Sequence, residues 1–264
     1  MNRLQYLILL ITLAIQLSAA QFRAGATKVD VTPKLWPVQL IGSFNERLAD
    51  KAHDPLHARA IVCDDGKTRL AIVIVDNCLI GRNYIDRAKA LAAKRTKIRA
   101  DQILVAATHT HSAPPGKDRR TNRDDVPHRA YFKQLVNGIA EAIIAAEKTL
   151  TPAEMAHGMA LVPEEVFNRR WHMKSGGIAV NPFGDPNDTV RMNPPRNLIE
   201  RPAGPIDPEV HFISFRGTDG RPIGLLANYS LHYVGGVPAA TISADYFGIF
   251  AGHIEKSLGK DKSY

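Results

Sequence analysis

The feature that most constrains the fold is a pair of short apolar runs, residues 70–75 and 103–107, with a helical pattern between them. Continuous apolar runs of this length are typical of strands that are covered on both faces of a sheet. Between the runs, residues 84–97 place Ile85 and Ala88 on one side of a helix. This arrangement predicts an α/β protein in which the strand at residues 70–75 is central.

Two histidines, His109 and His111, come directly after the second run and precede a proline-rich loop. Reactive groups in α/β proteins collect at the carboxyl ends of strands. Alternation along an extended backbone would put both imidazoles on the same side. Converging imidazoles suit a metal site or an acid/base pair. The ordinary structural alternative is one buried, hydrogen-bonded histidine and one solvated histidine.

A strand–turn–strand pattern occurs twice along the chain. The first copy begins after Asp54-Pro55 and turns at Asp65-Gly66, and the second begins after Asp207-Pro208 and turns at Asp219-Gly220. An Asp-Gly pair between strands is a strong hairpin signal. The second copy ends in an apolar strand that leads to His232. We therefore expect mixed β-sheets with covering helices, built from two related half-units.

Three further segments complete the expected organisation. Residues 129–150 and 245–258 have helical spacing, the latter with Phe250 and Leu258 among its inward positions. Residues 162–205 show little periodicity, and we interpret them as an active-site loop region. A βαβ pattern would return a strand to the sheet after the last helix, so the sequence predicts a fold that is incomplete at the C-terminus.

The first twenty residues resemble a secretory signal peptide, with a basic start, an apolar core and a small-residue cleavage site. The alternative is an uncleaved anchor helix. We therefore expect residues 21–264 to form the mature chain, as the N-terminal part of a catalytic domain, in a secreted or periplasmic location. Export permits a disulfide. However, Cys63 and Cys78 lie at opposite ends of one predicted hairpin, too far apart to bridge.

Composition and motifs exclude several classes of function. The net charge of +8 is spread along the chain and matches no nucleic-acid module. Solubility is the simplest explanation of this charge, although a basic protein could contact an anionic membrane surface. Neither a Gly-rich phosphate loop nor a Gly-x-Ser-x-Gly nucleophile elbow is present. The sequence does not specify an oligomeric state. His232, which ends the second apolar strand, is a candidate to join His109 in one cleft.

Several blocks in this order resemble the neutral/alkaline, non-lysosomal ceramidases, and the resemblance covers essentially the whole mature chain. The blocks are RAGA at residues 23–26, DVTP at 30–33, HDPLHARA at 53–60, ATHTHS at 107–112, NRR at 168–170, ANYSLH at 227–232 and ISAD at 242–245. The ATHTHS block is the specific one. Ser112 is followed by Ala-Pro-Pro where the family usually has Gly-Pro-Gly, which indicates a divergent, bacterial-type branch.

The resemblance implies a Zn²⁺-dependent amide hydrolase that cleaves the N-acyl bond of ceramide or a related N-acyl compound. It assigns His109 and His232 as zinc ligands, His111 to proton transfer and Arg169 to the substrate or oxyanion. The family's other ligands and a discussed serine nucleophile lie beyond residue 264. The two ligand nitrogens of His109 and His232 should then lie roughly 3–3.5 Å apart. The competing interpretation is a secreted, non-catalytic binding protein, or an inactive fragment, that keeps the fold.

Overall fold

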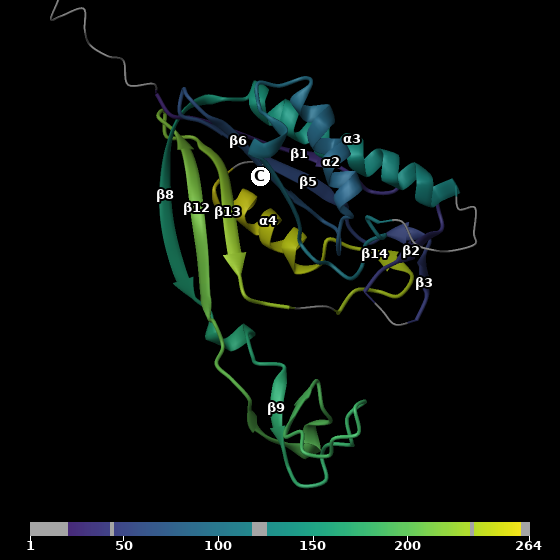
Figure 1. Cartoon of the computed structure of the whole chain (residues 1–264). Coiled ribbons are helices and arrows are strands. Elements are labelled where there is room, and N and C mark those ends of the chain that lie inside the picture. Colours follow the sequence, from purple (N-terminus) through teal and green to yellow (C-terminus); the bar gives the residue numbers. More distant parts are fainter. Residues whose placement is uncertain (1–20, 43–44, 118–125, 233–234, 260–264) are drawn as a thin grey trace, which may run out of the picture. The chain divides into compact units, whose positions relative to one another are not determined.

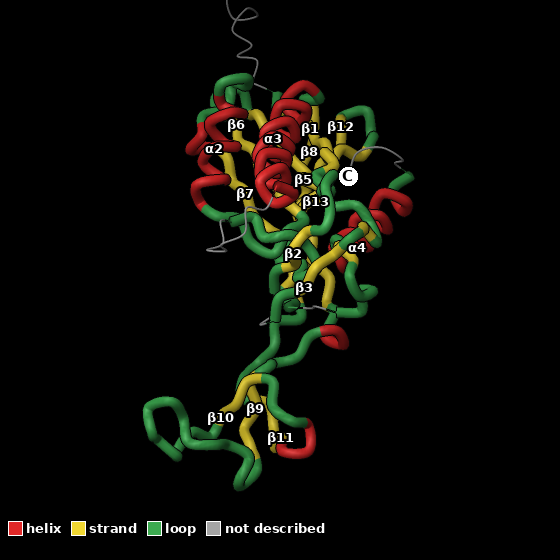
Figure 2. The backbone as a smooth tube through the Cα atoms, turned by 90° about the vertical axis from the view of Figure 1, so that its right-hand side faces the viewer, coloured by secondary structure: helices red, strands yellow, loops and turns green. Residues whose placement is uncertain are grey.

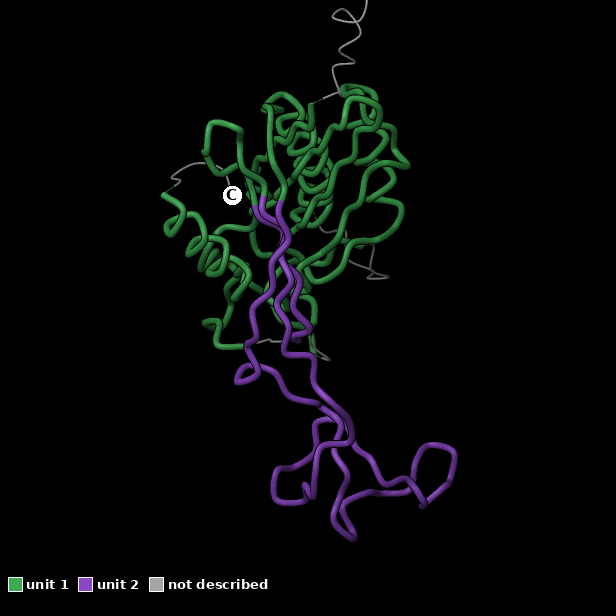
Figure 3. The backbone as a smooth tube through the Cα atoms, turned by 90° about the vertical axis from the view of Figure 1, so that its left-hand side faces the viewer, with its two compact units in different colours: residues 1–155, 215–224, 234–264 green, residues 156–214, 225–233 purple. Residues whose placement is uncertain are grey.

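The computed structural model describes residues 21–42, 45–117, 126–232 and 235–259 (Figure 1). The predicted signal peptide therefore lies outside the described residues. The chain divides into two compact units (Figure 3). Unit 1 comprises residues 1–155, 215–224 and 234–264, and unit 2 comprises residues 156–214 and 225–233. In the described residues, no helix is both long enough and apolar enough to cross a membrane.

A seven-stranded mixed sheet with the order β13-β12-β8-β1-β5-β6-β7 organises the chain. Its strands are β1 (Arg23–Asp30), β5 (His57–Asp64), β6 (Arg69–Val75), β7 (Ile103–Ala107), β8 (Thr151–Leu161), β12 (Glu209–Gly217) and β13 (Pro222–Tyr229). β5 pairs antiparallel with both β1 and β6, whereas β6 and β7 are parallel. Both predicted hairpins, β5–β6 and β12–β13, are confirmed, as is the α/β class with mixed sheets.

Two helices, α2 (Arg82–Ala93) and α3 (Val126–Lys148), pack on one face of the unit 1 sheet (Figure 2). Side chains at every second position of β5, including Ala60 and Val62, point into this layer and are buried. From α3, Leu135, Ile139 and Ile143 meet them and are fully buried. Burial of each such aliphatic side chain contributes about 1.5–3 kcal/mol, so this interface is the core of unit 1.

Two expectations about burial are wrong. β6 is an interior strand between β5 and β7, but it is not covered on both faces, because Val73 and Val75 are buried while Ile72 and Ile74 are partly exposed. Helices α2 and α3 pack on one face only, and the residues of β6 that point to the other face are partly exposed. The second expectation is that Phe250 of α4 (Asp245–Ser257) points inward, whereas its side chain is 40% exposed. An ion pair between Lys28 of β1 and Glu255 joins this helix to the sheet.

Shorter elements complete unit 1. β2 (Val38–Leu40) pairs with β3 (Arg47–Ala49), and β4 (Lys51–Ala52) pairs in parallel with β14 (Thr241–Ile242). The β4–β14 pair brings residues near position 50 beside residues near position 240. This long-range pairing matters for the histidine loop because it holds the segment after β14 close to the segment after β4.

Unit 2 contains a three-stranded sheet that the sequence did not indicate. β9 (Arg170–Met173) lies between β10 (Val190–Met192) and β11 (Ile199–Pro202) and is antiparallel to both. Residues 162–205 are therefore not simply a loop. The strands have only three or four residues, too few for a period of two to stand out, which explains why the pattern was not recognised.

Replacing a core leucine tests this packing. Leu135→Ala should lower the free energy of unfolding by about 2–5 kcal/mol, because Leu135 is fully buried between α3 and the sheet. Leu91→Ala on α2 is the matched control, because Leu91 is 39% exposed, and it should cost less than about 1 kcal/mol. Urea denaturation of both variants measures the difference. Equal losses would contradict the placement of the core.

A half-buried histidine, His57, at the start of β5 gives a pH dependence. Burial, with the Arg59 guanidinium beside it, lowers the pKa of His57 to about 4. An unfolded histidine titrates near about 6.5, so the unfolded state binds more protons between pH 4 and 6.5, and stability rises with pH there. Compared with His57→Gln, the wild type should show a free energy of unfolding that decreases as the pH falls from about 6.5 to about 4. Below about pH 4, the His57 imidazole should cause no further decrease. A difference independent of pH would contradict this assignment.

Candidate active site

The two histidines of the ATHTHS block lie where β7 ends, at the carboxyl edge of the parallel pair β6–β7. The backbone N–H of His109 donates to the carbonyl of Asn77, which follows β6, at 2.8 Å. His109 has a φ of +72°, so the chain turns sharply and is not extended here. The prediction that strand alternation makes the two rings converge is therefore wrong. A left-handed turn brings them together instead.

The hydrogen bonds of His109 define its tautomer. Its Nδ1 lies 2.8 Å from the carbonyl oxygen of Cys78, and a carbonyl only accepts, so Nδ1 carries the proton. The Nε2 lone pair then faces the Nε2 of His111 at 3.2 Å, with the rings at 81° and their centroids 4.8 Å apart. A backbone carbonyl on the outer nitrogen is the usual support for a metal-binding histidine.

The spacing of the two Nε2 atoms fits a shared cation as well as an N–H···N hydrogen bond. With Zn–N bonds of about 2.0–2.1 Å, two ligands at a tetrahedral zinc lie roughly 3.3 Å apart. His109 is exposed and His111 is half-buried, so the site is open to an incoming ligand. The structure therefore brings together His109 and His111 and leaves His111 able to serve as a ligand or as a base beside the metal.

Cys78 is a site residue that the sequence analysis missed. Its Sγ lies 3.6 Å from Nδ1 of His109, and the donor atoms of Cys78, His109 and His111 all lie within 4.8 Å of one another. Both cysteines are free, as predicted, but Cys78 is not merely a small apolar residue. Burial raises the pKa of its thiol, so a metal would have to displace the thiol proton for sulfur to bind. The parallel pairing of β6 with β7 could have identified Cys78, because the residues that follow two parallel strands meet at the same edge of the sheet.

The other predicted site residues, Arg169 and His232, lie in unit 2 and contact each other. Nη1 of Arg169 donates to Nδ1 of His232 at 2.9 Å. In this tautomer Nε2 of His232 carries the proton. A metal can therefore bind at Nδ1 only if Arg169 leaves that nitrogen, or at Nε2 only if that nitrogen loses its proton. The predicted approach of His232 to His109 joins two separate units and stays a prediction.

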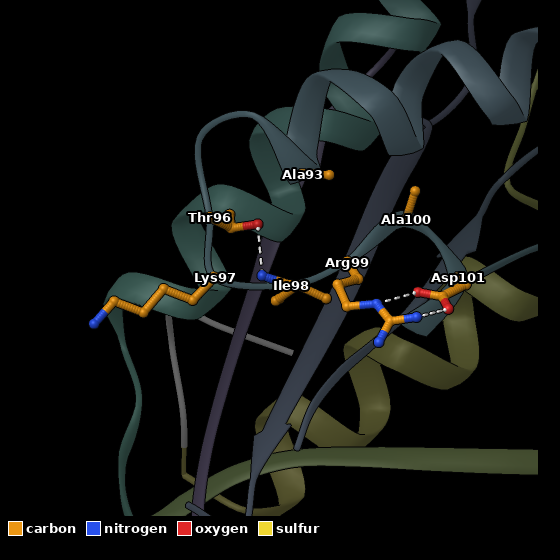
Figure 4. Close-up of a pocket in the computed structure, with 7 residues that line it drawn as sticks. All are labelled: Ala93, Thr96, Lys97, Ile98, Arg99, Ala100 and Asp101. Atoms are coloured by element: carbon orange, nitrogen blue, oxygen red, sulfur yellow. Dashed lines mark hydrogen bonds and ion pairs between the residues drawn. The ribbon is translucent and has the colours of Figure 1, made fainter. Parts of the chain in front are cut away.

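A surface hollow elsewhere in unit 1 contains none of these groups. Figure 4 shows it at the end of α2, with Arg99 paired to Asp101. Its lining residues are Ala93, Thr96, Lys97, Ile98, Arg99, Ala100 and Asp101. A single carboxylate that is already paired with an arginine gives this hollow no evident catalytic chemistry.

A glycine packs against the His111 ring and gives a test of its position. Gly42 has a φ of +96°, and a Cβ there would lie 2.3 Å from Cγ of His111. Gly42→Ala should cost about 1–3 kcal/mol for the backbone strain and also displace the ring. Gly220→Ala is the matched control, since its φ is +84° and no atom lies within 4 Å. NMR spectra of the imidazole protons should change for His111 in Gly42→Ala only; no change there would contradict the contact.

Comparison with known proteins identifies the family of this chain. The family model of the neutral/alkaline non-lysosomal ceramidase N-terminal region matches residues 22–264. The chain is 24% identical over 254 residues to neutral ceramidase from Pseudomonas aeruginosa, covering 92% of this chain and 35% of that protein. It is 22% identical over 222 residues to neutral ceramidase B from Dictyostelium discoideum, covering 81% of this chain and 28% of that protein.

The solved structures show the same fold. The crystal structure of the Pseudomonas aeruginosa neutral ceramidase superposes with a TM-score of 0.67 at 21% identity, over 92% of this chain and 37% of that one. A ceramidase complexed with C2 gives a TM-score of 0.64 at 23% identity, over 92% and 36%. The chain thus spans about a third of the length of these relatives. With the family model matching nearly its whole length, this chain belongs to the neutral/alkaline non-lysosomal ceramidase family.

Proposed function

We propose that this chain contributes to the active site of a zinc-dependent amide hydrolase that cleaves the N-acyl bond of ceramide or a related N-acyl compound. Membership of the ceramidase family supports a ceramidase-like hydrolase. The observation that carries the zinc proposal is the arrangement of His109, whose Nδ1 is fixed by the Cys78 carbonyl and whose Nε2 faces His111 at 3.2 Å.

The proposed roles follow from the chemistry of each side chain. His109 and His232 would hold the metal. Bound zinc supplies Lewis-acid chemistry, since it polarises a carbonyl and lowers the pKa of water. His111, beside His109, accepts a proton from the attacking water and returns it to the nitrogen of the departing amine. Arg169 donates hydrogen bonds to the oxygen that gains negative charge, and its contact with His232 keeps it near a proposed ligand.

The lipid nature of the proposed substrate leads to a proposal about location. A secretory signal peptide at residues 1–20 would place residues 21–264 in a secreted or periplasmic compartment, as the N-terminal part of a catalytic domain. The net positive charge of the chain favours peripheral contact with an anionic membrane surface. Phe183 of unit 2, which is 94% exposed, would add an apolar anchor to such a contact.

Substituting the two histidines one at a time tests the roles. His109→Ala should lose zinc and activity together, because it removes a direct ligand. His111→Ala should retain most of the zinc and lose about 10²–10⁴-fold in rate, the usual contribution of a positioned acid/base. His253→Ala on α4 is the control for adventitious binding, because this histidine is exposed.

Zinc content, thermal midpoint and hydrolysis of a fluorogenic N-acyl sphingosine should be measured on the same samples. Loss of metal in His111→Ala with metal retained in His109→Ala would reverse the two roles. If both variants lose thermal stability equally and residual activity follows the folded fraction, the histidines are structural. Zinc and substrate binding without turnover would favour a non-catalytic binding protein.

A further inference from the structure

A half-buried carboxylate near the histidine turn makes no ion pair among the described residues but accepts hydrogen bonds on both of its oxygens. Asp54 lies between β4 and β5, far from the histidines in sequence. Its Oδ1 accepts from the backbone N–H of Ala244 at 2.6 Å, and its Oδ2 accepts from the hydroxyl of Ser243. Hydrogen bonds to a carboxylate are about twice as strong as neutral ones. Asp54 therefore fixes the segment that follows β14.

The same segment holds the histidine turn from its other side. The backbone N–H of Ser243 donates to the carbonyl of Ser112 at 2.8 Å, and the carbonyl of Ser243 accepts from the Thr110 hydroxyl at 2.9 Å. Thr110 and Ser112 flank His111 on either side. The Ser112 N–H in turn donates to the Thr110 hydroxyl oxygen at 3.2 Å. A continuous chain of hydrogen bonds thus joins Asp54 to both neighbours of His111.

Burial gives this chain its rigidity. Thr110 is fully buried, Ser243 is 2% exposed and Ser112 is 7% exposed, so water does not compete for these bonds. By contrast His109, two residues before His111, is exposed. The polar groups on the interior side of the turn hold it in place, whereas the imidazoles remain available for chemistry.

We propose that Asp54 is a positioning residue for the metal and proton-transfer histidines, acting through Ser243 and Thr110. It touches neither imidazole in this role. It holds the turn in which His109 keeps its left-handed φ of +72° and His111 meets it at 3.2 Å. A left-handed non-glycine residue persists only where the surrounding structure determines it, and this clamp supplies that determination. The metal-binding part of the proposal rests on the proposed function.

Three variants test the clamp. Asp54→Asn keeps the shape of the side chain but removes the negative charge of the carboxylate, whose oxygens accept two hydrogen bonds. Thr110→Val keeps the volume and removes the hydroxyl, whereas Thr110→Ser keeps the hydroxyl and should retain wild-type behaviour. The control is Asp64→Asn, which removes a carboxylate that is buried and paired with Arg23 and Arg69 at the other end of the β5–β6 hairpin. The readouts are amide exchange at Ser112 and Ser243, imidazole NMR signals and zinc affinity.

Asp54→Asn and Thr110→Val should speed amide exchange at Ser112 and Ser243, shift the signals of both histidines and weaken zinc binding by about tenfold or more. Asp64→Asn should lower the thermal midpoint without these effects. If Asp54→Asn changes only the thermal midpoint, as Asp64→Asn does, the proposal is overturned. Should Asp54→Asn not fold, identical readouts for Thr110→Val and Thr110→Ser would overturn it. Wild-type protein that binds no zinc defeats the proposed function, and the exchange and NMR readouts still decide on the clamp.

Discussion

The parallel pairing of β6 with β7 is the constraint on which the candidate site depends. Parallel strands bring their carboxyl ends to one edge, so the residues that follow β6 meet the residues that follow β7. The pairing continues past the strands through two backbone bonds, from Thr108 to Val75 and from His109 to Asn77. These bonds place the Cys78 carbonyl against His109, and that carbonyl selects the tautomer whose lone pair faces outward.

A second layer of contacts turns this edge into an ordered site. The rings of His109 and His111 are exposed or half-buried, whereas the backbone and the hydroxyl between them are buried against Ser243. On the other side, Gly42 packs against the His111 ring, and Arg47 donates to the His111 carbonyl at 3.0 Å. The turn is therefore held by segments that are distant in sequence, which is the usual way in which a protein maintains a strained backbone at a reactive position.

Much of this arrangement could be predicted from the sequence. Apolar runs, Asp-Gly turns and helical spacing identified the strands and helices of the main sheet, because these signals are local. The convergence of His109 and His111 was also predicted, but for the wrong reason, since a left-handed φ at a histidine leaves no mark in the pattern of residue types. Cys78 was missed because its proximity to His109 depends on strand pairing across 31 positions. The sheet of unit 2 was missed because its strands are short and carry charged residues.

The proposal that the turn after β7 binds a catalytic metal can be tested directly. Crystals of the protein grown with zinc should be measured on both sides of the zinc absorption edge. We expect an anomalous peak about 2.0–2.1 Å from Nε2 of His109, with the Cys78 carbonyl still bonded to Nδ1. A fully zinc-saturated protein with no peak beside His109, or with its only peak at another site, would contradict it.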